Sequence, residues 1–275
     1  MLAQYSYLPR LLPIYSAVSF NGLMPGGGTR PWAVRVQEGP RGKLVPFVVK
    51  LFKASHLDQH PHLAAEVFGS VLADMFDLPH PEPALIEFSP AFRATLNEPQ
   101  QQQLAETAPG LLFGCRLVEG PYPYSRALPL KKLEAYEMET VYGFDNLILN
   151  TDRRPDKPNL LMPDGEEAVL IDHELSMSGI GRAFNNLTEG RWEHLYQRHL
   201  FYAPLKARGP AATAVAFGTF TEYLRGLNPQ LLRPYHQQLS ALDCSLPDFD
   251  LFFEYLCYQK ANAGQFQTQL RHTLS

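Results

Sequence analysis

The sequence predicts an α+β protein, with strands gathered in its first 120 residues and helices dominating its last third. Two observations lead to this prediction. Short apolar stretches bounded by glycine and proline recur between residues 32 and 119, as is typical of strands. From Ala183 onward these stretches stop, and apolar residues recur at helical spacing. Prolines cluster near residues 120–130, so we expect a β-rich part at 1–120 and a mainly helical part at 121–275.

A loop followed by a hairpin opens the β-rich part. Glycines and prolines at 24–31 interrupt any regular element and predict a loop. Residues 32–36 and 45–52 then predict two strands, joined by a turn at 38–43. A glycine-containing loop therefore leads directly into a β-hairpin.

One helix and two further strands complete this part. Apolar residues at 63–76 recur every three to four positions, which predicts an amphipathic helix that the following prolines end. Residues 84–88 and 110–119 predict strands. The glutamine-rich stretch 97–109 predicts an exposed loop or a loose helix.

The second part begins with a helix and another hairpin. Residues 131–150 carry a broad apolar face at helical spacing, which places Asp152 just past the end of a helix. Residues 160–162 and 168–171 predict two strands joined by a Pro-Asp-Gly turn. Asn159 and Asp172 therefore flank paired strands.

Composition excludes several classes of protein. The 275 residues are 45% hydrophobic and carry a net charge of −4, so a sizeable core is expected and no basic field draws the chain to nucleic acid or anionic lipid. Three cysteines without metal-like spacing predict free thiols in a reducing compartment. Without a secretory start or a run of ~20 apolar residues, we expect a soluble cytoplasmic protein without a membrane partner.

The polar residues around the second hairpin fit the chemistry of phosphoryl transfer. This reaction needs a base near the acceptor hydroxyl, oxygen ligands for magnesium and a cation on the phosphates. Asp152 can accept the hydroxyl proton, and Asn159 and Asp172 offer the oxygen ligands that Mg²⁺ prefers. The sequence therefore predicts an ATP- and Mg²⁺-dependent phosphotransferase.

A lysine within an apolar strand supplies the cation. Lys50 lies in the stretch 45–52, and a buried ammonium of this kind needs a carboxylate partner. Glu66, on the helix that follows, is the natural partner. Lys53 competes with Lys50 for the role.

The order of these motifs resembles the HipA-like kinases, especially their compact branch. The residues that carry the resemblance are the glycine run, Val-Val-Lys at 48–50, the helix glutamate, Asn-Thr-Asp-Arg at 150–153, Asn-Leu-Leu at 159–161 and Ile-Asp-His at 171–173. The catalytic segment is also similar to that of phosphatidylinositol kinases. The resemblance extends over about residues 22–180.

The resemblance implies a protein-kinase-like bilobal fold that uses ATP and Mg²⁺ in a cleft between a β-rich and a helical lobe. It implies a Ser or Thr hydroxyl of a protein as the acceptor, and the sequence names no antitoxin-like or regulatory partner. The roles implied are these: catalytic base, Asp152; metal ligands, Asn159 and Asp172; phosphate-anchoring pair, Lys50 and Glu66; phosphate-covering loop, Gly26, Gly27, Gly28 and Thr29; adenine hinge, Arg116, Leu117, Val118 and Glu119.

One spacing departs from the kinase pattern. The asparagine commonly stands five residues after the aspartate, but here that position is Lys157 and the asparagine is Asn159. We interpret residues 154–156 as carrying a two-residue extension. Asp156 is the alternative second metal ligand.

Other functions and clusters remain open at this stage. A small-molecule or phosphoinositide kinase would share the nucleotide chemistry, and a nucleotide-binding scaffold would bind ATP without transfer. His56, His60 and His62 are close enough in sequence for a metal site, although Pro61 favours a surface loop. His194 and His199 are expected to be structural.

Overall fold

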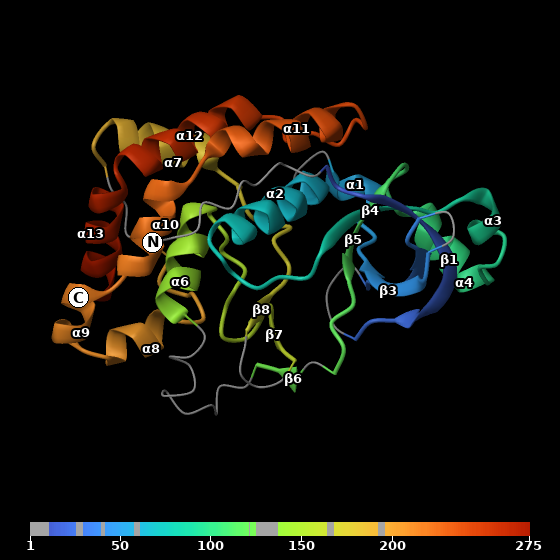
Figure 1. Cartoon of the computed structure of the whole chain (residues 1–275), viewed down its shortest axis with the longest axis horizontal. Helices are drawn as coiled ribbons and strands as arrows, with labels where there is room; N and C mark the ends of the chain where they lie inside the picture. The colour runs from blue at the N-terminus through green and yellow to red at the C-terminus, as the bar shows by residue number, and fades with distance from the viewer. Residues whose placement is uncertain are drawn as a thin grey trace.

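The computed structural model of the chain describes residues 11–25, 30–39, 42–57, 61–120, 122–124, 137–163, 168–191 and 196–275. It is a mixed fold with a β-rich N-terminal region at one end of the long axis and a helical C-terminal region at the other (Figure 1). The α+β composition that the sequence predicts is therefore correct.

The N-terminal region is a closed barrel, which the sequence did not predict. Its strands follow the order β1-β2-β3-β5-β4, and β1 closes the barrel by pairing parallel to β4. The sequence analysis missed β1 because its polar and apolar residues do not alternate cleanly, and two irregularities interrupt its pairing with β2. The strands are β1 (Ile14–Leu23), β2 (Trp32–Gln37), β3 (Leu44–Val49), β4 (Pro83–Glu87) and β5 (Leu112–Arg116).

Alternating side chains of these strands fill the barrel. Trp32, Val34, Phe47 and Val49 are all fully buried, as the period of two in a strand requires. Two short helices, α3 (Pro90–Arg93) and α4 (Glu98–Ala105), lie at the outer end of the barrel (Figure 1). The glutamine-rich segment that the sequence left as loop or loose helix thus forms α4, which begins with a capping box between Asn97 and Gln100.

A long helix connects the barrel to the rest of the molecule. After α1 (Ala54–Leu57), helix α2 (His62–Met75) runs from the barrel toward the C-terminal helices, and nearly all of it is buried (Figure 1). Gly69 permits its close approach to the segment after β8, because a Cβ atom there would lie 2.4 Å from the Cβ atom of His173. Helix α2 is thereby held against the chain that carries Asp172.

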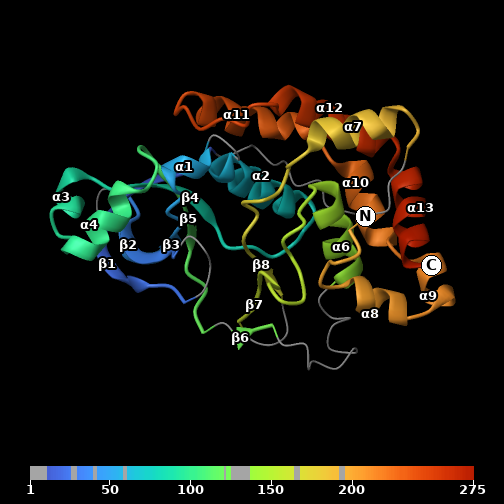
Figure 2. The same ribbon diagram turned by 180° about the vertical axis from the view of Figure 1, so that it is seen from behind.

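A small sheet and a buried helix lie between the two ends. Strands β6 (Tyr122–Pro123), β7 (Leu160–Met162) and β8 (Val169–Leu170) form an antiparallel sheet in that order, and β7 and β8 are the hairpin that the sequence predicts. Helix α6 (Met138–Leu147) lies between β6 and β7 in the sequence. Figure 2 shows this layer from behind, beside α2.

From Ile180 onward, the regular elements of the described chain are all helices. Phe76, which follows α2, forms part of the core of this region, where its ring stacks on Phe220 of α10 and lies tilted against Phe144 of α6. None of the helices in the described part of the chain is long and apolar enough to cross a membrane. The helices are α7 (Ile180–Thr188), α8 (Tyr202–Ala207), α9 (Pro210–Val215), α10 (Gly218–Gly226), the 3₁₀ helix η1 (Pro229–Leu232), α11 (Arg233–Ser240), α12 (Phe249–Ala261) and α13 (Ala263–Leu274).

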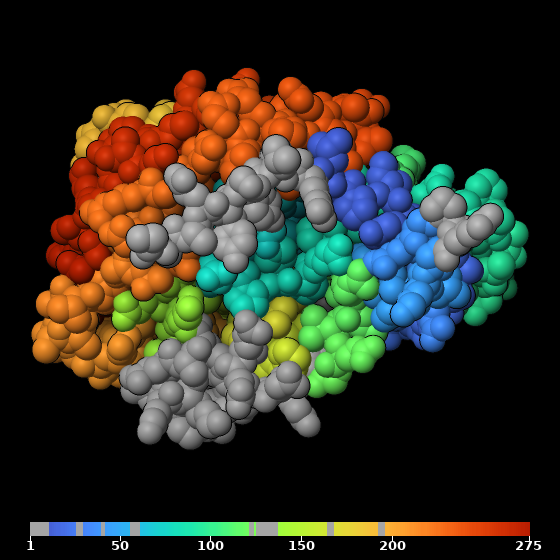
Figure 3. Space-filling model, viewed as in Figure 1, coloured from blue at the N-terminus to red at the C-terminus, as the bar shows by residue number. Residues whose placement is uncertain are grey.

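The C-terminal region also holds the start of the described chain. Leu12 exchanges two backbone hydrogen bonds with the side chain of Gln238 on α11, at 3.0 and 2.9 Å. Figure 3 shows the start of the described chain, in dark blue, against the orange surface of the C-terminal helices. The two ends of the molecule are therefore joined at this edge as well as through α2.

Candidate active site

Asp152 lies on the loop that leaves α6. Its backbone N–H donates to Oδ1 of Asn150 at 3.1 Å, which fixes the turn after the helix. Its carboxylate accepts hydrogen bonds from Nζ of Lys157 and, at 3.2 Å, from Nδ2 of Asn159. The predicted base is thus oriented by the two residues that compete for the usual asparagine position.

The two-residue extension forms a closed turn. The backbone groups of Arg154 and Lys157 exchange hydrogen bonds of 2.9 and 3.1 Å, with two residues at the tip. Asp156 is at this tip, 64% exposed, and its carboxylate pairs with Arg154 at 3.5 Å. This placement favours Asn159 over Asp156 as the second metal ligand, because Asn159 lies beside Asp152 and Asp156 is directed to solvent.

The same turn brings a cation into the site. Nζ of Lys157 contacts the carboxylate of Asp152 and lies 3.1 Å from Oδ2 of Asp172. A single ammonium therefore bridges the predicted base and a predicted metal ligand. Lys157 had appeared in the sequence only as a departure from the kinase spacing.

Asn159 and Asp172 flank the β7–β8 hairpin. The N–H of Ile171 donates to the carbonyl of Asn159 at 3.2 Å, next to the pairing of the strands. Both residues adopt left-handed backbone angles, with φ of 46° for Asn159 and 65° for Asp172. Such angles are costly for residues with a Cβ atom and cluster at functional sites. The two side chains thus emerge at one end of the hairpin.

Lys50 joins the barrel to this hairpin. It follows the last residue of β3, and its ammonium pairs with Glu66 on α2 and, at 2.5 Å, with Oδ1 of Asp172. The competing Lys53 pairs instead with Glu106 at 3.1 Å on the exposed surface. The structure thus brings Lys50, Glu66 and Asp172 together and leaves Lys53 outside.

Glu174 is a member of this cluster that the sequence analysis did not assign. Carboxylate oxygens of Glu66, Asp172 and Glu174 lie within 4.8 Å of one another. Oε2 of Glu174 is buried and has no hydrogen-bond partner among the described residues, although it lies 3.5 Å from Nζ of Lys50. Buried carboxylates with a spare acceptor fit a divalent cation that prefers oxygen ligands. In the sequence, the feature that could have pointed to Glu174 is its position two residues after Asp172.

Burial and the neighbouring charges shift the pKa values of this cluster in opposite directions. Burial disfavours the Lys50 ammonium, but Glu66, Asp172 and Glu174 together raise its pKa. Burial raises the pKa of Glu66 to about 7, although Lys50 opposes the shift. Asp172 is also buried, but Lys50 and Lys157 hold its pKa below the usual range. Near neutral pH, Lys50 is therefore expected to be protonated and Asp172 to be ionised.

A second ionic network adjoins the first, because Arg153 follows Asp152 in the chain. Nε of Arg153 donates to Oδ2 of Asp145 at 2.6 Å, and Nε2 of His199 lies 2.8 Å from the same oxygen. Arg153 also donates to the carbonyls of Asn159 and, at 3.4 Å, Ile171. It therefore ties the loop of Asp152 to the strand ends that carry the predicted metal ligands. The sequence analysis assigned none of these roles, although it expected His199 to be structural.

Burial sets the protonation of this second network. Despite its burial, Arg153 and His199 lower the pKa of Asp145 to about 2. Burial lowers the pKa of His173 to about 3 and, against its bond to Asp145, that of His199 below the usual value. One charged pair with neutral histidines around it is the expected state near pH 7.

The predicted nucleotide-binding segments have different outcomes. Gly26, Gly27, Gly28 and Thr29 lie outside the described residues. Of the predicted hinge, 116–119, Arg116 ends β5 and pairs with Glu38 and, at 2.9 Å, with Glu82. The N–H of Leu117 donates to the carbonyl of Pro46 at 3.0 Å. This backbone donor is therefore used within the barrel.

Of the histidine cluster near residue 60, the structure describes only the side chain of His62. Nδ1 of His62 lies 3.1 Å from the carbonyl of Glu174, and its ring stacks on Phe52. The side chain of His56 and the whole of His60 lie outside the described residues. His62 therefore supports the segment after Asp172.

A nucleophilic role is not indicated for Cys115, the cysteine beside the predicted hinge. Cys115 is a free thiol on β5, and burial raises its pKa to about 12. Its thiolate is therefore not populated near neutral pH.

Comparison with known proteins supports the resemblance noted from the motifs. The model of the HipA-like kinase family matches residues 21–201, and the chain belongs to this family. A crystal structure of a Helicobacter pylori proinflammatory kinase, CtkA, is similar with a TM-score of 0.49 and 10% sequence identity, over 96% of this chain and 98% of that chain. No curated protein matches the chain.

Proposed function

We propose that this HipA-like kinase transfers the γ-phosphoryl group of ATP to a hydroxyl group in an Mg²⁺-dependent reaction. The observation that carries the proposal is the connected cluster Lys50–Asp172–Lys157–Asp152. A phosphate anchor, a metal ligand, a second cation and a base are thereby adjacent. Phosphoryl transfer needs these groups and little covalent chemistry from the protein.

Asp152 is the proposed base. It accepts the proton of the acceptor hydroxyl, and its hydrogen bond from Asn159 orients the carboxylate. Asn159 and Asp172 would hold Mg²⁺, with Glu174, whose carboxylate lies close to that of Asp172, as a further ligand. An Mg²⁺ ion bound there would supply positive charge against the phosphate oxygens.

Two lysines hold the phosphates. Glu66 positions the Lys50 ammonium, which binds the non-transferred phosphates. Lys157 stands between Asp152 and Asp172, where the transferred phosphoryl group has to pass. Its ammonium stabilises the charge that develops there.

The acceptor is proposed to be a Ser or Thr hydroxyl of a protein, as the family resemblance implies. The proposal includes a protein-kinase-like division into two lobes near residue 120, with residues 116–119 as the hinge and Gly26 to Thr29 covering the phosphates. It also places the protein in the cytoplasm, with no nucleic acid or membrane partner. A small-molecule kinase is the second candidate, because the same cluster would serve any hydroxyl.

The test is phosphoryl transfer by the purified chain. Incubation with labelled ATP and Mg²⁺ is expected to label the chain itself or a protein acceptor from a cell extract, and Asp152→Asn is expected to abolish labelling while retaining ATP binding. Absence of both ATP binding and label transfer in the wild type would refute the proposal. Binding without transfer to any acceptor would identify a nucleotide-binding scaffold instead.

A further inference from the structure

An ammonium group lies among the side chains that are proposed to hold the metal ion. Nζ of Lys157 contacts Oδ2 of Asp152 and lies 3.1 Å from Oδ2 of Asp172. The same oxygen of Asp152 accepts the hydrogen bond from Nδ2 of Asn159 at 3.2 Å. Lys157 therefore supplies a positive charge at the point where Asn159, Asp172 and the proposed base meet.

Both oxygens of the Asp172 carboxylate are already in use. Oδ1 lies 2.5 Å from Nζ of Lys50, and Oδ2 lies 3.1 Å from Nζ of Lys157. Mg²⁺ needs its oxygen ligands at ~2.0–2.1 Å, and its two positive charges repel an ammonium held by the same carboxylate. One of the two lysines therefore has to leave Asp172 before a divalent cation can bind there.

Lys157 is the lysine that can leave more easily. Three carboxylates lie within 3.5 Å of Nζ of Lys50, and its side chain is only 12% exposed. Lys157 has two carboxylate partners, and its side chain is 32% exposed. An ion pair near solvent is cheaper to break, because water replaces part of the lost interaction. We therefore expect Lys157, rather than Lys50, to give way to a metal ion.

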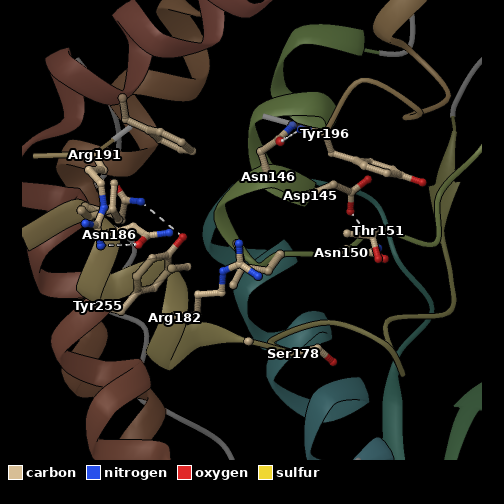
Figure 4. Close-up of a pocket in the computed structure, with 16 residues that line it drawn as sticks. Asp145, Asn146, Asn150, Thr151, Ser178, Arg182, Asn186, Arg191, Tyr196 and Tyr255 are labelled. Carbon is tan, nitrogen blue, oxygen red and sulfur yellow. Dashed lines mark hydrogen bonds between the residues drawn. The ribbon is translucent and has the colours of Figure 1, made fainter. Parts of the chain in front are cut away.

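The surroundings of the loop offer little to a displaced Lys157. Asp156, at the tip of the same turn, is 64% exposed and pairs with Arg154, so another ion pair there would contribute little. A cavity of about 440 Å³ beside the loop has one carboxylate among its described lining residues, that of Asp145 (Figure 4). Arg153 already holds this carboxylate. Without a ligand, Lys157 would exchange its partners in the site for water.

A bound nucleotide changes this balance. The phosphate oxygens of ATP can accept the charged hydrogen bonds that Lys157 gives up, so its ammonium exchanges one set of anionic oxygens for another. The cost of leaving Asp172 is then largely offset. Since coupling between two ligands is reciprocal, the nucleotide strengthens metal binding by the same factor as the metal strengthens nucleotide binding.

We propose that Lys157 competes with Mg²⁺ for Asp172, so that a metal ion is bound well only together with a nucleotide whose phosphates take over the Lys157 ammonium. The inference rests on the proposed function, and it names a means by which the same site is regulated. The movement of Lys157 also releases the carboxylate of Asp152 for the acceptor hydroxyl. Metal binding and availability of the base are thereby both linked to ATP.

The first test measures metal binding by the purified full chain without nucleotide. Mn²⁺ is the probe, because the electron paramagnetic resonance signal of the free ion gives its dissociation constant. We expect Lys157→Met to bind Mn²⁺ about tenfold more tightly than the wild type, since one charged contact no longer has to be broken. Lys157→Gln is a second neutral variant with the same expectation. Lys157→Arg keeps the charge and is expected to bind Mn²⁺ as the wild type does.

Two controls locate the effect. Lys53→Met removes a lysine that pairs with Glu106 on the surface, and it is expected to leave Mn²⁺ affinity unchanged. In an Asp172→Asn background, Lys157→Met is expected to bring no gain in Mn²⁺ affinity, because the carboxylate for which Lys157 competes is gone.

The second test measures the link to the nucleotide. The affinity for a fluorescent, non-hydrolysable ATP analogue is determined with and without Mn²⁺. The factor by which Mn²⁺ strengthens analogue binding is expected to be about tenfold smaller in Lys157→Met than in the wild type, because the side chain that couples the two ligands is lost.

The outcomes separate this inference from the proposed function. An Mn²⁺ affinity that is unchanged or lower in both neutral variants would overturn the competition, even if the wild type transfers label. A gain that persists in the Asp172→Asn background, or an equal effect of Mn²⁺ on analogue binding in wild type and Lys157→Met, would also overturn it. Tighter Mn²⁺ binding in the neutral variants of a chain that transfers no label would uphold the competition and refute the kinase reaction.

Discussion

Two ionic networks meet at one turn of the chain, and they differ in what surrounds them. The network of Asp152 opens toward Lys50 of the barrel, and its lysines stay partly accessible. The network of Asp145 and Arg153 is fully buried, with 0% of either side chain exposed. The consecutive residues Asp152 and Arg153 are both buried, but only Asp152 pairs with a partly accessible lysine.

This difference separates residues that are expected to take part in the reaction from residues that are expected to stabilise the fold. An ion pair that keeps contact with solvent can exchange its partner for a ligand, because the protein does not need the pair in order to fold. A buried pair that also satisfies backbone carbonyls cannot be broken without leaving a charge in a low dielectric. We therefore expect changes at Asp152 to affect turnover and changes at Asp145 to affect stability.

The sharpest test of this contrast is Asp152→Asn. Loss of a general base lowers rates by about 10²–10⁴-fold, so kcat for label transfer is expected to fall by that factor. ATP affinity and the free energy of unfolding are expected to stay near the wild-type values, because the surrounding lysines remain. A stability loss as large as the activity loss would show that Asp152 is structural.

Asp145→Asn is expected to have the opposite signature. Removing one partner of a buried ion pair costs about 3–5 kcal/mol, measured as the free energy of unfolding in urea. Asp250→Asn is the matched control, since Asp250 is 86% exposed and lies 3.8 Å from Arg233. Retained stability in Asp145→Asn would remove the distinction between the two networks.

Lys157→Met tests the cation that the sequence did not assign. We expect kcat/KM for ATP to fall about tenfold or more, because one phosphate contact in the transition state is lost. Lys53→Met is the control, since Lys53 pairs with Glu106 on the surface. Equal effects of the two substitutions would contradict a role for Lys157 in the reaction.

The pH dependence of stability tests the buried network in a second way. His173 has a folded pKa of about 3, below the ordinary value of 6.5, so only the unfolded chain takes up its proton between these values. Its contribution to stability is therefore present above pH 6.5 and lost as pH falls toward 3, at about 1.4 kcal/mol per pH unit.

Urea unfolding between pH 6.5 and 4.5 measures this slope. His173→Asn should reduce the slope of the unfolding free energy against pH by up to the contribution of one proton, about 1.4 kcal/mol per pH unit. This holds whatever the substitution does to the absolute stability. An identical slope in both proteins would mean that His173 is charged in the folded state.

The sequence could predict those parts of the site that follow from local pattern. Lys50 in an apolar strand and Glu66 on the next helix were paired from burial alone, and the structure brings them into contact. The β7–β8 hairpin placed Asn159 and Asp172 at the ends of paired strands. Such inferences succeed because neighbouring strands and helices set the distances.

Features that depend on tertiary contacts could not be predicted in this way. The closed barrel needs the parallel pairing of β1 with β4, whose residues are about 70 positions apart and carry no local signal. Lys157 reaches Asp152 only because residues 154–157 close into a turn. Asp145 looked like an ordinary polar residue on a helix, and its pairing with His199 spans 54 positions.

The most direct test of the central claim is a crystal structure of the chain with a non-hydrolysable ATP analogue and Mn²⁺, whose anomalous signal locates the metal. The account predicts Mn²⁺ bound by Asn159 and Asp172, with Lys50 on the phosphates and Asp152 facing the γ-phosphoryl group. Metal on Asp156, or a nucleotide bound away from Lys50 and Asp172, would contradict it.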